Sequence, residues 1–168
     1  AGCRRERRQS ALGGLGGCKR ATASPFDPGA GAGGGGLTWL EARAARNVTF
    51  IELEPGAAGF CEHNLVTRGL SDHAEVVIAD VLIASRARRG EADLVVCNPP
   101  YVAPGAGRPS PEPRRARARQ GDLAHFVASA RLLLGRRGRA AFVFPAPQLT
   151  TLLAPLRAAG LDPKRKRR

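Results

Sequence analysis

Short apolar runs alternate with longer amphipathic stretches along this chain, and the two kinds of segment have different periods. The short runs are rich in β-branched and apolar residues, and they predict strands over residues 48–53, 75–80, 93–97 and 139–144. The longer stretches contain helix formers with apolar residues three or four positions apart, and they predict helices over residues 37–45, 55–68, 122–134 and 148–159. Leu161 is expected to begin one more strand.

Prolines, glycines and an aspartate mark the ends of these segments. Pro55 fits the first turn of its helix, and Gly69 fits the end of that helix. Asp122 is placed to cap the next predicted helix. Gly160 is expected to end the last helix, which Pro155 would kink.

Three segments outside these elements have loop composition. Residues 27–36 are a glycine-rich loop, in which the glycines from 33 to 36 are expected to delay the start of the next helix. Residues 104–120 are rich in Pro, Gly and Arg and predict a loop. Residues 1–24 show no period and are expected to be poorly ordered.

Strands that alternate with helices at this spacing predict an α/β fold, a doubly wound parallel sheet with helices on both faces. In such sheets, ligands bind beyond the carboxyl ends of the strands. Polar residues fall at or just after the predicted strand ends, namely Asp27, Glu52, Asp80 and Asn98. We therefore expect these side chains to line one edge of the sheet and to form the functional site.

Length and composition limit the class of protein. A chain of 168 residues with 43% hydrophobic residues fits one globular domain. No apolar run approaches the roughly 18 residues that a membrane helix needs, and no apolar signal segment follows the N-terminal arginines. The 4 cysteines show neither CxxC spacing nor histidines at zinc-site spacing. These features predict a cytoplasmic protein with reduced thiols, no metal and no membrane partner.

Positive charge is concentrated in the C-terminal part of the chain. The net charge is +13, and residues 101–168 hold fifteen basic and three acidic side chains, whereas residues 25–100 hold six basic and ten acidic ones. Such asymmetry is typical of proteins that bind a polyanion. An arginine-rich surface that is merely solvated is the alternative.

The glycine-rich loop has the composition of a cofactor-binding turn. Gly29 and Gly31 follow Asp27 at alternate positions and allow the backbone to approach a ligand closely, because glycine has no side chain and tolerates positive φ. Together with Gly34, these glycines also match the GxGxxG pattern of dinucleotide-binding proteins. The loop alone therefore does not identify the cofactor.

Acidic residues on the next two strands indicate an adenosine group. Glu52 lies about 20 positions after the loop at a strand end, where a carboxylate can accept hydrogen bonds from ribose hydroxyls. Glu54 competes for this role. Asp80 repeats the arrangement on the third strand and can accept from an adenine amino group. Both NAD and S-adenosylmethionine (SAM) contain adenosine, so these residues do not choose between them.

The tetrapeptide Asn98-Pro99-Pro100-Tyr101 directly follows a short apolar strand and distinguishes between these two cofactors. Its two prolines impose an extended, rigid turn that lacks two N–H donors. The Asn98 side-chain oxygen and the Pro99 carbonyl can both accept from one NH₂ group, while Tyr101 offers a ring for stacking. This arrangement would orient a planar amine toward a methyl donor and stabilise positive charge developing on its nitrogen.

This motif resembles that of the NPPY-type class I SAM-dependent methyltransferases. The downstream sequence, with Ser110-Pro111, the stretch ARARQGDLAHF and the ending GLDPKR, is similar to the valine-tRNA adenine-N6 methyltransferase family, which acts beside the anticodon. The resemblance implies a Rossmann-like class I methyltransferase sheet, SAM as cofactor and tRNA as substrate. It assigns cofactor binding to Asp27, Gly29, Gly31, Glu52, Asp80 and Asn98, and catalysis to Asn98, Pro99 and Tyr101. The arginines expected to grip RNA phosphates are Arg114, Arg115, Arg117 and Arg119, with Arg108 beside them.

The resemblance also sets the expected domain organisation. Residues 25–168 correspond to the methyltransferase domain, and residues 1–24 do not resemble the segment that precedes it in the family. Residues 21–26 are a poor match to the apolar strand that the family has before its glycine loop. The family's sheet closes with an antiparallel pair of strands, so we expect this domain to be incomplete at both ends. We also expect a monomer.

Two other functions fit parts of this sequence. Methylation of a glutamine amide in protein release factors uses the same tetrapeptide geometry. A non-catalytic, arginine-rich RNA-binding remnant of a methyltransferase would bind RNA without binding SAM. A dehydrogenase would account for the glycine loop but would leave Asn98 to Tyr101 unexplained.

Overall fold

A parallel sheet of five strands organises the part of the chain that the computed structural model describes, residues 25–100 and 123–164. The strand order is β3-β2-β1-β4-β5, and each neighbouring pair is parallel. The strands are β1 (Pro25–Pro28), β2 (Val48–Glu52), β3 (Ala74–Ile78), β4 (Ala92–Cys97) and β5 (Leu134–Phe142). The α/β class predicted from the sequence is confirmed.

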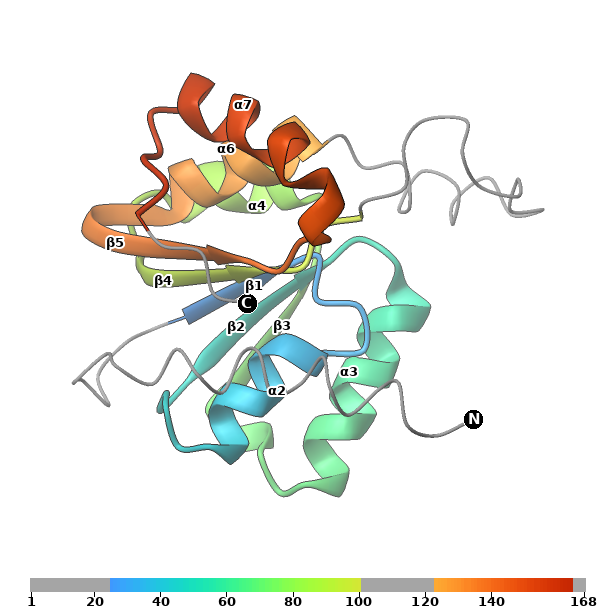
Figure 1. The fold of residues 1–168 in the computed structure, drawn as a ribbon. Helices are drawn as coiled ribbons and strands as arrows, with labels where there is room; N and C mark the ends of the chain where they lie inside the picture. The colour runs from blue at the N-terminus through green and yellow to red at the C-terminus, as the bar shows by residue number, and fades with distance from the viewer. Residues whose placement is uncertain (1–24, 101–122, 165–168) are drawn as a thin grey trace.

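Helices cover both faces of this sheet (Figure 1). One face carries α2 (Gly34–Glu41) and α3 (Pro55–Thr67), and the other carries α4 (Val81–Ala87), α6 (Leu123–Leu133) and α7 (Leu149–Ala158). Two 3₁₀ turns, η1 (Ser71–His73) and η2 (Ala146–Gln148), lie in the connections. The chain is therefore doubly wound around β1.

Alternation along the buried strands divides the core between the two faces. Ile51 and Val95 point to the face where they pack with Phe126 and other residues of α4 and α6. Phe50 and Val96 point to the opposite face and pack with residues of α2 and α3. Both faces of β2 and β4 are apolar, as central strands of a parallel sheet require.

Pro55, Gly69 and Gly160 lie at helix ends, as the sequence predicts. Pro55 occupies the first turn of α3, where its missing N–H costs no hydrogen bond. Gly69 and Gly160, which follow α3 and α7, have φ angles of +65° and +70°, the left-handed conformation that ends many helices. Pro155 lies inside α7, as predicted. Asp122 lies outside the described residues.

The first helix differs from its predicted range, 37–45. It begins at Gly34 and ends at Glu41, so the expectation that the glycines delay the helix is wrong. The reason is packing. A Cβ on Gly36 would lie 2.4 Å from Phe50 Cε1 and 2.8 Å from Val48 Cγ1, so glycine allows the first turn of α2 to lie directly on β2.

Other elements also differ from the sequence prediction. The four residues Pro25–Pro28 form β1, although residues 21–26 match the family's apolar strand poorly. The strand predicted over 139–144 begins earlier, at Leu134. Helix α4 was not predicted, because its short apolar sequence continues that of the preceding strand. Residues 161–164 form no strand, so the strand expected from Leu161 does not begin there.

Replacing Gly36 with alanine should lower the free energy of unfolding, despite the higher helix propensity of alanine. The added methyl group would overlap Phe50, and such overpacking typically costs about 1–3 kcal/mol. Gly34 is the matched control, because it lies in the same helix and a Cβ there meets nothing within 4 Å. Gly34→Ala should be neutral or stabilise by about 0.5 kcal/mol. Thermal unfolding of both variants measures the difference, and equal melting temperatures would contradict this account of α2.

Candidate functional site

The connection from β1 to α2 crosses the carboxyl end of β2 and forms the centre of the site. The amides of Gly29 and Ala30 both donate to the carbonyl of Ile51, at 2.8 and 3.1 Å. Gly29 and Gly31 have φ angles of +74° and +57°, which confirms that the turn needs glycine at these positions. A Cβ on Gly31 would meet no protein atom within 4 Å, so the backbone is open to a ligand there.

Glu52 holds this loop from the end of β2. Its side chain is buried, with 7% of the residue exposed. One carboxylate oxygen accepts from the Gly31 amide at 2.7 Å, and the other accepts from the Glu54 amide at 2.9 Å. Of the two glutamates that compete for the cofactor role, Glu52 is therefore the one that contacts the glycine loop. Glu54 precedes α3 as its N-cap residue.

Asp27 holds the other end of the loop. Its side chain is 4% exposed, and Oδ2 accepts from the Gly36 amide in the first turn of α2, at 2.8 Å. Burial raises the pKa of this carboxyl to about 7; the hydrogen bond from Gly36 lowers it in part, and the nearby charge of Glu52 raises it further. Asp27 is therefore a buried acid that changes protonation state near neutral pH.

The position of Asp27 bears on the choice of cofactor. In dinucleotide-binding folds, a pyrophosphate occupies the N-terminus of the helix after the glycine loop. Here a carboxylate accepts from an amide of that same helix turn, so a second anion would be repelled when Asp27 is ionised. The local charge instead favours a cofactor that carries positive charge.

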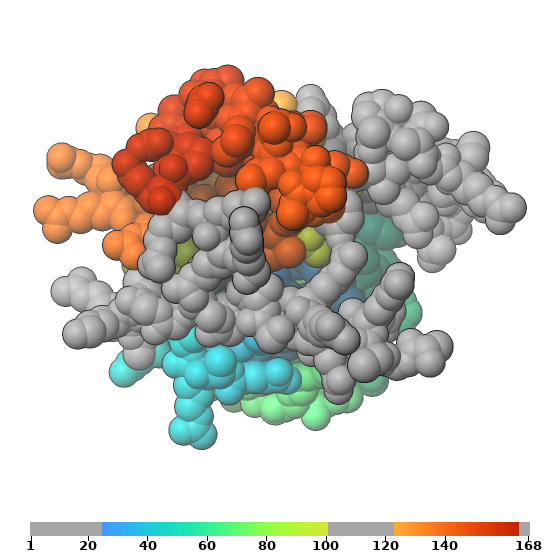
Figure 2. Space-filling model, in the orientation of Figure 1, coloured from blue at the N-terminus to red at the C-terminus, as the bar shows by residue number. Residues whose placement is uncertain are grey.

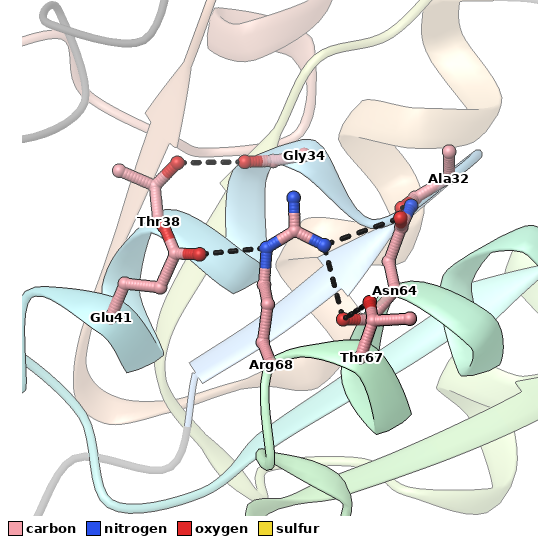
Figure 3. Close-up of polar contacts among 7 residues, drawn as sticks. All are labelled: Ala32, Gly34, Thr38, Glu41, Asn64, Thr67 and Arg68. Atoms are coloured by element: carbon pink, nitrogen blue, oxygen red, sulfur yellow. Dashed lines mark hydrogen bonds and ion pairs between the residues drawn. The ribbon is translucent and has the colours of Figure 1, made fainter.

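Helix α3 supports the loop from outside (Figure 3). The Asn64 side chain donates to the carbonyl of Ala32 at 3.0 Å. Arg68, one turn later, donates to Asn64 at 3.1 and 3.2 Å and to Glu41 of α2 at 2.8 Å. These contacts link α3 to both the glycine loop and α2. They were not anticipated, because no local pattern connects Asn64 with residues that precede it by 32 positions.

Asp80 lies two residues beyond the end of β3 and caps α4. Its Oδ1 accepts from the amides of Leu82 and Ile83 at 2.8 and 3.1 Å. The Ala79 amide donates to the Glu52 carbonyl at 3.0 Å, so Asp80 lies close to the end of β2. Leu53, which directly follows Glu52, is 45% exposed and offers an apolar surface beyond the end of β2.

Asn98 is exposed and directly follows the buried end of β4. Cys97 Sγ lies 3.5 Å from the carbonyl of Pro28, to which it donates, and the Cys97 carbonyl accepts from Val143. Because Pro28 directly precedes Gly29, these contacts bring Asn98 beside the start of the glycine loop. Pro99 is fully buried and anchors the turn. Tyr101 and the predicted RNA-binding arginines 114, 115, 117 and 119 lie outside the described residues.

Phe126 of α6 also contacts the glycine loop, a role that no sequence pattern indicates. A Cβ on Gly29 would lie 2.6 Å from Phe126 Cε1, so the aromatic ring lies directly against the Gly29 backbone. Phe126 itself is 7% exposed and belongs to the core beneath α4 and α6. Gly29 is therefore needed both for its φ angle and for this close contact.

The remaining reactive groups do not extend the site. Burial raises the pKa of the Cys61 thiol to about 12 and that of Cys97 well above its usual range, so neither is a thiolate at neutral pH. Among the described residues, no group of His, Cys, Asp and Glu could hold a metal ion. No helix in the described ranges combines the length and the hydropathy needed to cross a membrane.

Comparison with known protein families identifies one match. Residues 19–112 match the model of the methyltransferase small domain. The sequence is 33% identical over 129 residues to the tRNA1(Val) (adenine(37)-N6)-methyltransferase of Shewanella halifaxensis, covering 74% of this chain and 52% of that protein. It is 32% identical over 120 residues to the enzyme of the same name from an Enterobacter species, covering 68% and 49%. The chain thus spans about half the length of these relatives.

Solved structures share the fold at low sequence identity. A SAM-dependent O-methyltransferase from Thermotoga maritima superposes with a TM-score of 0.66 at 18% identity, over 90% of this chain and 49% of that one. A precorrin 8w decarboxylase from Methanobacterium thermoautotrophicum superposes with a TM-score of 0.65 at 21% identity, over 93% and 72%. These similarities confirm the Rossmann-like sheet.

Proposed function

Because this chain belongs to the methyltransferase small domain family, we propose that it transfers a methyl group from SAM to an exocyclic nitrogen, the N6 atom of an adenine in tRNA. The observation that carries the proposal is the position of Asn98, exposed at the end of β4 beside the first turn of the glycine loop. A methyl donor in the loop and an amine on Asn98 would then be neighbours. The names of the relatives support tRNA as the substrate.

The residues around the glycine loop fit SAM. Its ribose hydroxyls would find an acceptor in Glu52, its adenine would lie against Leu53 near Asp80, and its positive charge would face Asp27. The open backbone at Gly31 leaves room for the ligand. When bound, SAM supplies an electrophilic methyl group, which needs no metal.

Asn98 and Pro99 would orient the substrate amine. The side-chain oxygen of Asn98 and the carbonyl of Pro99 each accept one N–H of the amine, which directs the nitrogen lone pair toward the methyl group. The same acceptors stabilise positive charge as it develops on nitrogen, and such preorganised contacts are a major source of rate enhancement. The buried ring of Pro99 keeps this acceptor pair rigid. Tyr101 would stack on the base.

Incubation with methyl-labelled SAM tests the proposal. The purified chain is given either total tRNA or a protein release factor, and the label is followed into RNA and protein. We expect the label in tRNA, as N6-methyladenosine after digestion to nucleosides. Label in the release factor alone would reject the proposal.

The exposed Asn98 would also accept a glutamine amide, because that group offers the same planar NH₂. Protein glutamine methylation is therefore the second candidate, and the protein arm of the labelling experiment tests it. A non-catalytic RNA-binding remnant is the third. Calorimetric titration with SAM separates it from both enzymes, since a clear one-site isotherm would exclude it.

A further inference from the structure

Four exposed arginines lie beside β4 and β5, at the end of the sheet opposite the glycine loop. Arg89 lies between α4 and β4, Arg131 lies in the last turn of α6, and Arg136 and Arg137 lie near the start of β5. The Gly90 amide donates to the Leu132 carbonyl at 2.9 Å, which joins these segments. We call this set of four arginines the basic end. In Figure 2 the orange segment around the α6–β5 junction projects from the left side of the molecule.

An irregularity in the pairing of β4 and β5 displays two of these arginines. Ala92 pairs with Leu134 and Leu94 pairs with Arg139, so residues 135–138 of β5 lie opposite Asp93 alone. Gly135 and Gly138 flank the two arginines and pack against the backbone of the neighbouring segment. A Cβ on Gly135 would lie 3.0 Å from the Gly90 carbonyl oxygen, and a Cβ on Gly138 would lie 2.8 Å from the Ala92 carbonyl oxygen. The backbone of these extra residues is therefore held against residues 90–92, while the side chains of Arg136 and Arg137 are exposed.

The arginines of the basic end have no acidic partner in the described part of the chain. The ion pairs there are Arg68 with Glu41, Arg88 with Glu75 and Glu91, and Lys164 with Asp162. Arg88, the neighbour of Arg89, also lies over the ring of Phe26, 5.2 Å from its centroid. Arg88 thus pairs with Glu91. Asp93, which lies opposite residues 135–138, forms no ion pair with these arginines within the described residues, and it is one acid beside four basic side chains.

We infer that the basic end binds the phosphate backbone of the RNA substrate, at a second contact remote from the methyl-transfer site. This inference rests on the proposed function for the class of RNA. Arginine presents a planar fork of donors that matches phosphate oxygens. Four such side chains, exposed and without an ion pair to any described residue, form a surface that attracts a polyanion and is screened by salt.

The distance between the two sites requires a large substrate. Asn98 follows the carboxyl end of β4, whereas Arg136 and Arg137 lie opposite its amino end. Five residue steps along β4, from Asp93 to Asn98, separate them, which is roughly 17 Å at about 3.3 Å per residue. A free nucleoside cannot reach both, but a folded RNA can place one base at Asn98 and a helical arm on the basic end.

An anionic membrane is a less suitable partner. Peripheral membrane surfaces combine basic residues with exposed apolar side chains that enter the lipid. The large apolar side chains that are exposed in the described residues lie elsewhere, at Leu53, Phe60, Val66, Ile78 and Ile83. None lies in the segments that form the basic end.

The double variant Arg136→Ala/Arg137→Ala tests this surface in the full chain. The probe is fluorescein-labelled valine tRNA, and its Kd is measured by anisotropy across about 50–200 mM salt. The expected result is a Kd raised on the order of tenfold and a salt slope reduced by about two, one for each lost phosphate contact. Arg43→Ala/Arg46→Ala is the matched control, because it removes two exposed arginines from the loop between α2 and β2. This loop lies at the same end of the sheet but beside β2, which β1 and β4 separate from β5. The control should bind as the wild type does.

The outcomes separate this inference from the proposed function. If the Arg136/Arg137 variant keeps the wild-type Kd and salt slope while the wild type still methylates tRNA, the inference about the basic end is overturned and the proposed function stands. If the variant binds tRNA more weakly but methyl label enters only protein, the proposed function is overturned and the inference about the basic end stands. Equally weakened tRNA binding in the Arg43/Arg46 control would show a general effect of charge and would overturn the inference that the basic end is a specific RNA contact. Phosphatidylglycerol vesicles serve as a third probe, and an effect confined to them would also overturn it.

Discussion

Replacing Asn98 with alanine should lower the rate of tRNA methylation by about a hundredfold or more, because it removes an acceptor for the substrate amine where charge develops. Asn98 is exposed, and the turn is anchored by the buried Pro99, so the fold should remain intact. The proposed RNA phosphate contacts lie elsewhere, so the Kd for tRNA should change little. Single-turnover incorporation of labelled methyl groups measures the chemical step.

Two controls make this test specific. Asn47→Ala removes another exposed asparagine, which lies just before β2 at the far end of the sheet, and it should retain full activity. Calorimetry with SAM shows whether the Asn98 variant still binds its cofactor. Unchanged turnover in Asn98→Ala would reject the proposed role of Asn98.

Replacing Asp27 with asparagine should change how stability depends on pH. The pKa of Asp27 is raised from 3.8 to about 7, so the folded protein holds this proton more tightly than the unfolded chain does. The contribution of this tighter proton binding to the stability of the fold is complete below about pH 4 and is lost as the pH rises to about 7. The full difference corresponds to about 4 kcal/mol at about 1.4 kcal/mol per pKa unit. Asparagine can still accept from Gly36, but it carries no charge and should remove this dependence.

The measurement is the difference in unfolding free energy between wild type and Asp27→Asn, without SAM, at a series of pH values. Taking the difference cancels groups that titrate alike in both proteins. The wild type should lose stability relative to the variant from about pH 4 to about pH 7 and then remain level. A flat difference across that range, or one that changes in the opposite direction, would contradict the raised pKa.

The sequence predicted the main strands well because their patterns are local. The β-branched run at Val48–Glu52 and the apolar run at Ala92–Cys97 need no distant contact to be recognised as strands. The sequence does not predict helix α4, because Val81 and Leu82 continue the apolar character of β3 and because Asp80, which caps the helix, also fits a cofactor-binding role. The start of α2 was misplaced because Gly36 is favoured there by its contact with Phe50, which a helix propensity does not include.

The candidate site was predictable for a related reason. In a parallel sheet the carboxyl ends of the strands meet at one edge, so the spacing of Asp27, Glu52 and Asn98 was enough to bring them together. The contacts that hold the site in shape were not predictable. Phe126 and Asn64 contact the glycine loop only because their helices pack across the folded sheet.

The anchoring of the glycine loop has a consequence for the thermodynamics of ligand entry. Ile51, Glu52 and Asn64 fix this loop through separate hydrogen bonds from β2 and α3, so its backbone entropy is already lost when the chain folds. A ligand then meets a rigid surface and need not order it, which favours fast association and a small entropic penalty. Loosening any anchor would transfer that ordering cost to the binding step.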